Sequence, residues 1–176
     1  MASPNSSYGS IIVIERMGKH TMAKAYDKMY LEDASDNLGF MLGYAESFGF
    51  NPVEVWKKFI VSKAASKIEK GDVCFISGHS PLDYLLFVFE NDKDRYERLS
   101  KAISQDNKKE LDDVCYWAGF SLAQFQYESG LSFSEIDHYL PIQDVLNMFY
   151  PLHEADVTKF FDVANSRIDQ KKKNGS

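Results

Sequence analysis

The segment from residue 111 to residue 127 limits the possible folds of this chain most strongly, because it predicts one helix with two apolar faces. At about 100° per residue, one face carries Leu111, Val114, Ala118, Leu122 and Phe125. The other face, roughly opposite, carries Tyr116, Phe120 and Tyr127. Such a helix is either enclosed by other helices on both sides or presents its second face to a partner.

Helical spacing continues through most of the chain, and 44% hydrophobic with 14% aromatic residues is enough to bury a core. Helix starts are predicted at Asn51-Pro52, at Ser80-Pro81 and at the capping box from Ser132 to Glu135. We therefore expect an all-α, single-domain bundle of about seven or eight helices. Further boundary signals are Asn107 with Glu110, which predicts the cap of the two-faced helix, and Gly49 and Gly130, which predict helix ends.

The two ends of the chain differ in composition from the helical part. Residues 1–21 are expected to form a loose N-terminal arm, in which residues 11–14 are a candidate strand. Residues 22–170 are expected to form the helical domain, and residues 171–176 a disordered basic tail. Within the domain, residues 73–76 are the other candidate strand, and the charged stretch 91–107 predicts an amphipathic helix.

Three glycines inside predicted helices indicate close packing. Gly39 and Gly43 are four residues apart and lie on one helix face, and Gly119 lies in the two-faced helix. Glycine costs a helix about 0.5–1 kcal/mol relative to alanine. We therefore expect another helix to approach closely at these positions.

The two cysteines, Cys74 and Cys115, are too few for a disulfide framework, and their apolar neighbours predict buried free thiols. No segment reaches the roughly 18 apolar residues that a membrane-spanning helix requires. These features favour a cytoplasmic protein with no membrane partner.

Charge is unevenly distributed along a chain whose net charge is −6. From residue 111 to residue 160 there are eight acidic residues and one basic residue, Lys159, whereas residues 57–70 contain five lysines and one glutamate. Nucleic-acid-binding proteins usually carry a basic face, so direct nucleic-acid binding is not expected. The acidic stretch is either a solvated helix face or a surface that attracts a basic protein.

Candidate catalytic and metal-binding residues are few. His153 and Asp156 are three residues apart at a predicted helix start, but two ligands do not make a metal site, and an acidic residue there complements the helix dipole. Ser80 follows His79 and is better explained as a helix cap than as a nucleophile. We expect no catalytic residue, no metal and no cofactor.

The aromatic face of the two-faced helix is the strongest candidate for a partner-binding surface. It is either a second buried face or an exposed interface, and large aromatic side chains are favoured at the centres of interfaces. The predicted partner-binding residues are Tyr116, Trp117, Phe120, Tyr127, Glu128, Asp137, His153, Glu154 and Asp156.

Five segments carry a resemblance to known proteins: YLEDASDNLG at residues 30–39, FIVS at 59–62, YWAGF at 116–120, SFSEI at 132–136 and YPLHEADV at 150–157. Over roughly residues 22–165 the chain resembles a family of uncharacterised helical bacterial and mobile-element proteins. Members of this family often occur near genes for toxins of the ADP-ribosyltransferase type. The resemblance implies an antitoxin or another inhibitor that binds protein. Residues 1–21 and the stretch 91–107 depart from the family pattern.

We therefore expect a non-enzymatic inhibitor that binds a protein target with a basic surface, either a toxin or a defence nuclease. An antitoxin and a phage-type anti-CRISPR or anti-restriction protein both fit this description. One alternative is a small hydrolase or transferase that uses His153, Glu154 and Asp156. Another is a structural protein that associates with itself through the aromatic face. The sequence leaves the target and the oligomeric state open.

Overall fold

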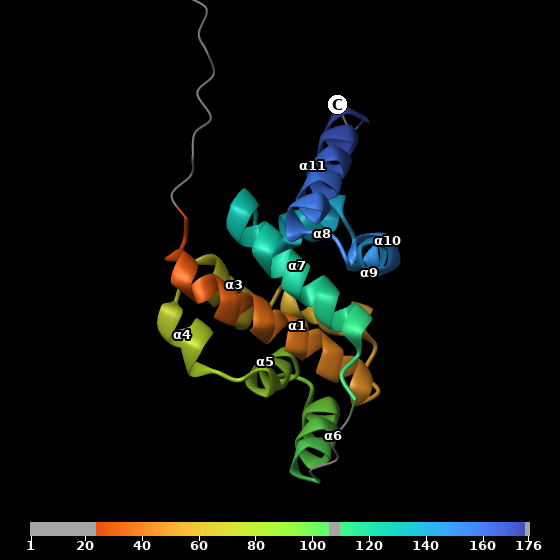
Figure 1. Ribbon diagram of the computed structural model, residues 1–176. Coiled ribbons are helices and arrows are strands. Elements are labelled where there is room, and N and C mark those ends of the chain that lie inside the picture. The colour runs from red at the N-terminus through yellow and green to blue at the C-terminus, as the bar shows by residue number, and fades with distance from the viewer. Residues whose placement is uncertain (1–23, 106–109, 175–176) are drawn as a thin grey trace, which may run out of the picture.

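The computed structural model describes residues 24–105 and 110–174, and these residues fold entirely into helices joined by short connections. The all-α prediction is confirmed. The described residues form more helices than expected because short turns divide several of the predicted segments (Figure 1). The elements are η1 (Lys28–Tyr30), α1 (Leu31–Ser47), α2 (Pro52–Phe59), α3 (Lys63–Glu69), α4 (Val73–Gly78), α5 (Pro81–Val88), α6 (Lys93–Ser104), α7 (Asp113–Ser129), α8 (Phe133–Tyr139), α9 (Ile142–Asn147), α10 (Phe149–Leu152) and α11 (Val157–Asn174).

Helices α1 and α7, the two longest among the described residues before residue 131, pack against each other in opposite directions and form the centre of the molecule (Figure 1). Glycines make this close approach possible, as predicted. A Cβ atom at Gly39 would meet the Tyr116 ring, one at Gly43 would meet Leu111, and one at Gly119 would overlap the α1 backbone. The two helices can therefore approach more closely than larger side chains would allow.

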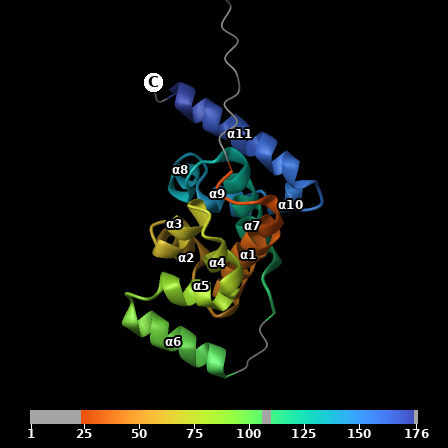
Figure 2. The ribbon, with the colours of Figure 1, turned by 90° about the vertical axis from the view of Figure 1, so that its left-hand side faces the viewer.

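The other helices lie on the two sides of this central pair. Helices α2, α4 and α5 pack against α1, whereas α8 to α11 pack against α7. The two groups meet in the core, where the rings of Trp56 and Phe59 from α2 contact the ring of Phe133 from α8 at centroid distances of 5.3–5.6 Å. Figure 2 shows α6 and α11 at opposite ends of the molecule.

Local capping explains where most helices begin and end. The side chains of Asn51, Ser80 and Ser132 accept hydrogen bonds from the first turns of α2, α5 and α8, as predicted. Gly130 ends α7 in a left-handed conformation with φ of 70°. The predicted cap of α7 is wrong in part. Asn107 lies outside the described residues, and the side chain of Asp112 caps the helix by accepting from the N–H of Cys115 at 2.7 Å.

Two predictions about secondary structure are corrected. Residues 73–76 are helical, because Asp72 caps α4 and the helix turns Phe75 and Ile76 into the core. Residues 171–174 are part of α11, because lysine is a good helix former and its charge is favourable at a helix C-terminus. The candidate strand at residues 11–14 and the arm at residues 1–21 lie outside the described residues.

The charged stretch at residues 91–107 contains α6, as predicted, and two arginines attach this helix to the rest of the molecule. Arg95 Nη1 lies 2.6 Å from Glu54 Oε1 of α2. Arg98 Nη2 donates to the carbonyl of Gly49 at 3.1 Å, and its guanidinium lies over the Phe50 ring. None of the helices in the described part of the chain is both long enough and apolar enough to cross a membrane.

Candidate functional site

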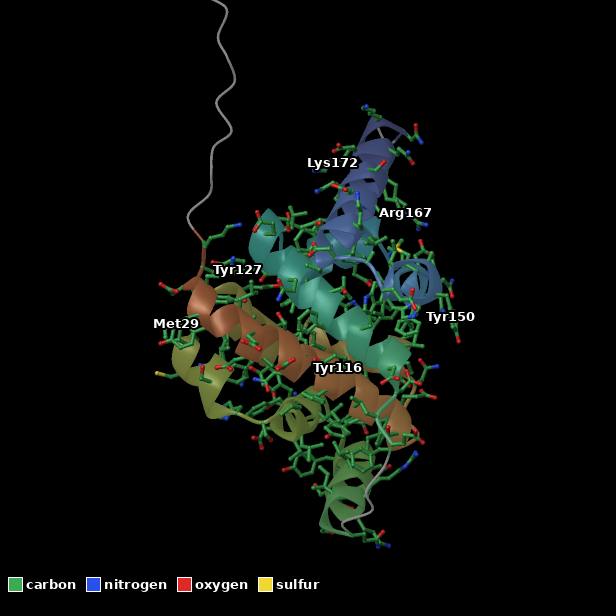
Figure 3. The ribbon with its side chains drawn as sticks, viewed as in Figure 1. Met29, Tyr116, Tyr127, Tyr150, Arg167 and Lys172 are labelled. Atoms are coloured by element: carbon green, nitrogen blue, oxygen red, sulfur yellow. The ribbon has the colours of Figure 1, made fainter. Side chains whose placement is uncertain are left out.

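Four half-buried aromatic rings form a continuous row across the α1–α7 seam, and we call them the aromatic row. Phe40 of α1 contacts Tyr116 of α7 at a centroid distance of 4.9 Å. Phe40 also stacks on Tyr44 at 5.9 Å, and Tyr116 contacts Phe120 at 6.0 Å. Figure 3 shows Tyr116 on the face formed by the two helices. Two of the four rings, Tyr116 and Phe120, were predicted from the second face of the two-faced helix.

Tyr116 is held in place from two directions. Its ring lies over Gly39, where any side chain would displace it. Its hydroxyl donates a 2.6 Å hydrogen bond to Asp36 Oδ1 on α1. Partial burial, together with the neighbouring Asp36 carboxylate, raises the pKa of the Tyr116 hydroxyl above its ordinary value. Tyr116 therefore stays neutral and acts as a hydrogen-bond donor at physiological pH.

A hollow of about 250 Å³ lies beside the aromatic row, and we call it the acidic hollow. Asp33 accepts a hydrogen bond from Ser77 at 2.8 Å, and Asp36 accepts the bond from Tyr116. Within the described residues, neither carboxylate forms an ion pair with a Lys, Arg or His side chain. The hollow thus combines negative charge with an aromatic edge. Its lining residues are Asp33, Asp36, Asn37, Phe40, Ile76, Ser77, His79 and Pro81.

Tyr127 and Glu128 belong to a different environment from the rest of the predicted stripe. Tyr127 is only 9% exposed, and its ring packs on Tyr26 at 5.1 Å. Lys24 Nζ donates to the main-chain carbonyls of Tyr127 and Glu128 and lies 3.2 Å from the Glu128 carboxylate. The N-terminal part of the described chain therefore covers Tyr127, and the Lys24 ammonium satisfies two carbonyl groups at the C-terminal end of α7.

Trp117 and His153 meet in a separate aromatic cluster around α10. The Trp117 ring contacts Phe149 at 5.9 Å, and the His153 ring stacks on Phe149 at 4.5 Å. Tyr150 extends from this cluster and is 81% exposed (Figure 3). Glu154 lies beside His153 and is exposed. The predicted partner-binding residues therefore do not form one patch: Tyr116 and Phe120 lie in the aromatic row, Tyr127 and Glu128 lie at the end of α7, and Trp117, His153 and Glu154 lie around α10.

Three of the polar residues that the sequence singled out support the local structure. Asp156 accepts from the N–H and hydroxyl of Thr158, and these bonds hold its pKa below the usual value. Asp137 accepts from the indole N–H of Trp56 and from the N–H of Ile142, each at 3.0 Å. Ser80 forms a capping box with Asp83.

The geometry around His153 brings few reactive groups together. His153 Nε2 lies 3.8 Å from Glu154 Oε1, and its Nδ1 faces main-chain carbonyls of α10. Asp156 is directed into the first turn of α11 by its bonds to Thr158. Among the residues that the structure describes, no three His, Cys, Asp or Glu side chains are arranged to hold a metal ion.

Sequence reasoning missed the contribution of α1 to the candidate surface. Asp36, Phe40 and Tyr44 are spaced four residues apart and therefore lie on one helix face. This spacing was a usable signal. It is obscured by the stronger core pattern of Leu38 and Met41, which are fully buried on the other side of the same helix.

We compared the chain with protein-family models, with curated proteins and with solved structures, and no match was found in any of the three.

Proposed function

We propose that this protein is a non-enzymatic inhibitor, acting in the cytoplasm, which binds a basic protein target through the aromatic row and the acidic hollow. The observation that carries the proposal is the position of the aromatic row. Four half-buried rings from two helices lie side by side, next to two carboxylates that no described cation neutralises. Interfaces are enriched in aromatic side chains at their centres and in complementary charge around them.

The aromatic row is suited to binding because its central ring is already ordered. The Gly39 backbone and the Asp36 carboxylate fix the Tyr116 ring before any target arrives. Association then loses less side-chain entropy than it would with a mobile ring. The rings of Phe40 and Phe120 supply apolar area that is still partly in contact with water.

Charge favours a basic target. Glu32, Asp33 and Asp36 lie on the first half of α1, and Asp112 and Asp113 lie at the start of α7. Because both helices carry these negative groups, they raise the rate of encounter with a positive surface. A toxin of the ADP-ribosyltransferase type is the first candidate, as the family resemblance suggests, and a nucleic-acid-binding channel of a defence nuclease is the second.

The same charges argue against self-association through this face. A two-fold interface with its axis close to Asp33 and Asp36 would place the carboxylates of one copy near those of the other. Such like-charge contacts are unfavourable unless a cation separates them. A heterologous basic partner is therefore the better occupant of this surface.

The proposal is tested by expressing the protein together with the product of each neighbouring gene and measuring affinity for any partner that co-purifies. A Phe40→Ser/Phe120→Ser variant should weaken binding by about 100-fold, since each large apolar side chain contributes roughly 1.5 kcal/mol or more when buried. The matched control is Tyr150→Ser, which removes an exposed ring from α10 and should leave the affinity unchanged.

Charge is tested separately with Asp33→Asn/Asp36→Asn against Glu154→Gln/Asp169→Asn, a pair of exposed carboxylates outside this surface. The first pair should slow association and reduce its dependence on salt, and the second should do neither. The proposal fails if the Phe40/Phe120 variant binds normally, or if the Tyr150 variant loses the target instead. Light scattering at two protein concentrations would detect a self-associating protein.

A further inference from the structure

A cavity of about 380 Å³ opens between α3, α4 and α5, away from the aromatic row. Small-molecule sites typically have volumes of about 300–1,000 Å³, with apolar walls and a few polar groups. This cavity has that composition, and it shares only His79 with the acidic hollow. Its lining residues are Lys63, Ala64, Lys67, Asp72, Cys74, Phe75, His79, Phe87 and Glu90.

Three rings in mutual contact form the apolar wall of the cavity. Phe75 meets His79 edge to face at a centroid distance of 4.7 Å and lies 5.5 Å from Phe87. The His79 and Phe87 rings are 5.2 Å apart. Aromatic rings in tilted and edge-to-face arrangements present both faces and edges, which suit a flat aromatic guest.

The charges at the rim are only partly neutralised. Lys67 Nζ lies 2.7 Å from Asp72 Oδ2, so these two residues pair with each other. Lys63 is exposed and pairs with no residue of the described chain, and the same is true of Glu90. Of the five lysines in residues 57–70, Lys63 and Lys67 line the cavity, and Lys58 pairs with Asp92 instead. The rim beside Lys63 therefore favours an anion, and Glu90 partly opposes that preference.

We propose that this cavity is a binding site for a small organic anion that carries an aromatic ring. The ring packs against Phe75 and Phe87, and the anionic group lies near the ammonium of Lys63. No residue of the aromatic row lines this site, and His79 is the one lining residue that it shares with the acidic hollow.

Cys74 provides a direct readout, because it lines the cavity and is exposed, whereas Cys115 is buried. The experiment measures the rate at which N-ethylmaleimide, a neutral reagent, alkylates Cys74, with peptide mapping to identify the thiol. The probe is 2-naphthoate. Acetate has the charge without the ring, and 2-naphthylmethylamine has the ring with the opposite charge.

We expect 2-naphthoate to slow alkylation of Cys74 in a saturable manner, and acetate and the amine to leave the rate unchanged. Lys63→Glu should weaken this protection by about fivefold, the effect of about 1 kcal/mol at an exposed charge, and Glu90→Gln should strengthen it. For each variant, the alkylation rate with 2-naphthoate is divided by the rate without it. A substitution that only changes the intrinsic reactivity of Cys74 therefore leaves this ratio unchanged. Lys101→Glu, on α6, is the matched control and should behave as the unmodified protein.

Three results would overturn the proposal. The first is that 2-naphthoate does not protect Cys74, and the second is that the amine protects Cys74 equally well. The third is that 2-naphthoate protects Cys74 to the same extent in Lys63→Glu. None of them bears on the aromatic row, so the two proposals can fail separately.

Discussion

Gly119 on α7 lies directly against the main-chain carbonyl of Leu38 on α1. A Cβ atom at this position would overlap that carbonyl, and a backbone group cannot rotate away as a flexible side chain can. The two central helices would have to separate to admit even one methyl group. The stability of the α1–α7 pair therefore depends on this glycine.

Gly119→Ala should lower the free energy of unfolding by about 1–3 kcal/mol, the usual penalty for overpacking. This penalty outweighs the helix propensity that alanine gains, about 0.5–1 kcal/mol. Gly78→Ala is the control, because a Cβ at Gly78 in α4 meets no atom within 4 Å and should be neutral or stabilising. Urea unfolding of both variants measures the difference. Equal effects would mean that the contact with Leu38 does not limit packing.

Asp137→Ala should destabilise the protein by about 1–3 kcal/mol, because it leaves the buried indole N–H of Trp56 without an acceptor. Trp56 is fully buried and donates to Asp137 at 3.0 Å. Asp137→Asn keeps an oxygen at the same position and should cost less. Denaturation followed by tryptophan fluorescence measures both changes. An equal loss in Asn and in Ala would show that the charge of Asp137, and not its acceptor, is what matters.

Glu135→Gln tests the contribution of a capping carboxylate to acid stability. Hydrogen bonds from the N–H and hydroxyl of Ser132 hold the pKa of Glu135 below its ordinary value. A carboxylate of this kind stabilises the fold above its unfolded pKa, about 4.3, and the stabilisation is lost as the pH falls through the lower folded pKa.

The difference in thermal midpoint between the unmodified protein and Glu135→Gln should therefore be largest near neutral pH and should shrink as the pH falls below about 4. Other capping carboxylates, such as Asp72 and Asp156, titrate in both proteins and cancel in the comparison. A difference that is independent of pH would exclude the ionised form of Glu135 as its cause.

The two thiols should differ sharply in reactivity. Burial raises the pKa of the Cys115 thiol and keeps it protonated, whereas Cys74 is exposed. A colorimetric disulfide reagent should therefore detect one thiol quickly and the second only when the protein unfolds. Two fast thiols would show that α7 opens readily at its N-terminal end.

The features that the sequence predicted well depend on residues close together in the chain. A cap such as Ser132 acts on a backbone N–H three residues away, and Gly130 ends a helix by its own conformation. The helical spacing that defines the two faces of α7 is equally local. These signals are sufficient to predict the fold class and most helix boundaries.

The exposure of each face was not predictable in the same way, because it depends on distant segments. Tyr127 is covered through Lys24, 103 residues earlier, and Tyr116 is fixed by Asp36, 80 residues earlier. Cys74 was expected to be buried from its apolar neighbours. It is exposed because α4 is a helix that turns Phe75 and Ile76 inward and leaves Cys74 outside.

The seam between α1 and α7 joins two helices that each supply rings to the aromatic row. A target protein that contacts both Phe40 and Phe120 would contact α1 and α7 at the same time. Binding energy is then added to the free energy that opposes opening of the seam. Backbone amides along both helices should therefore exchange with deuterium more slowly in the complex, even at positions that the target does not contact.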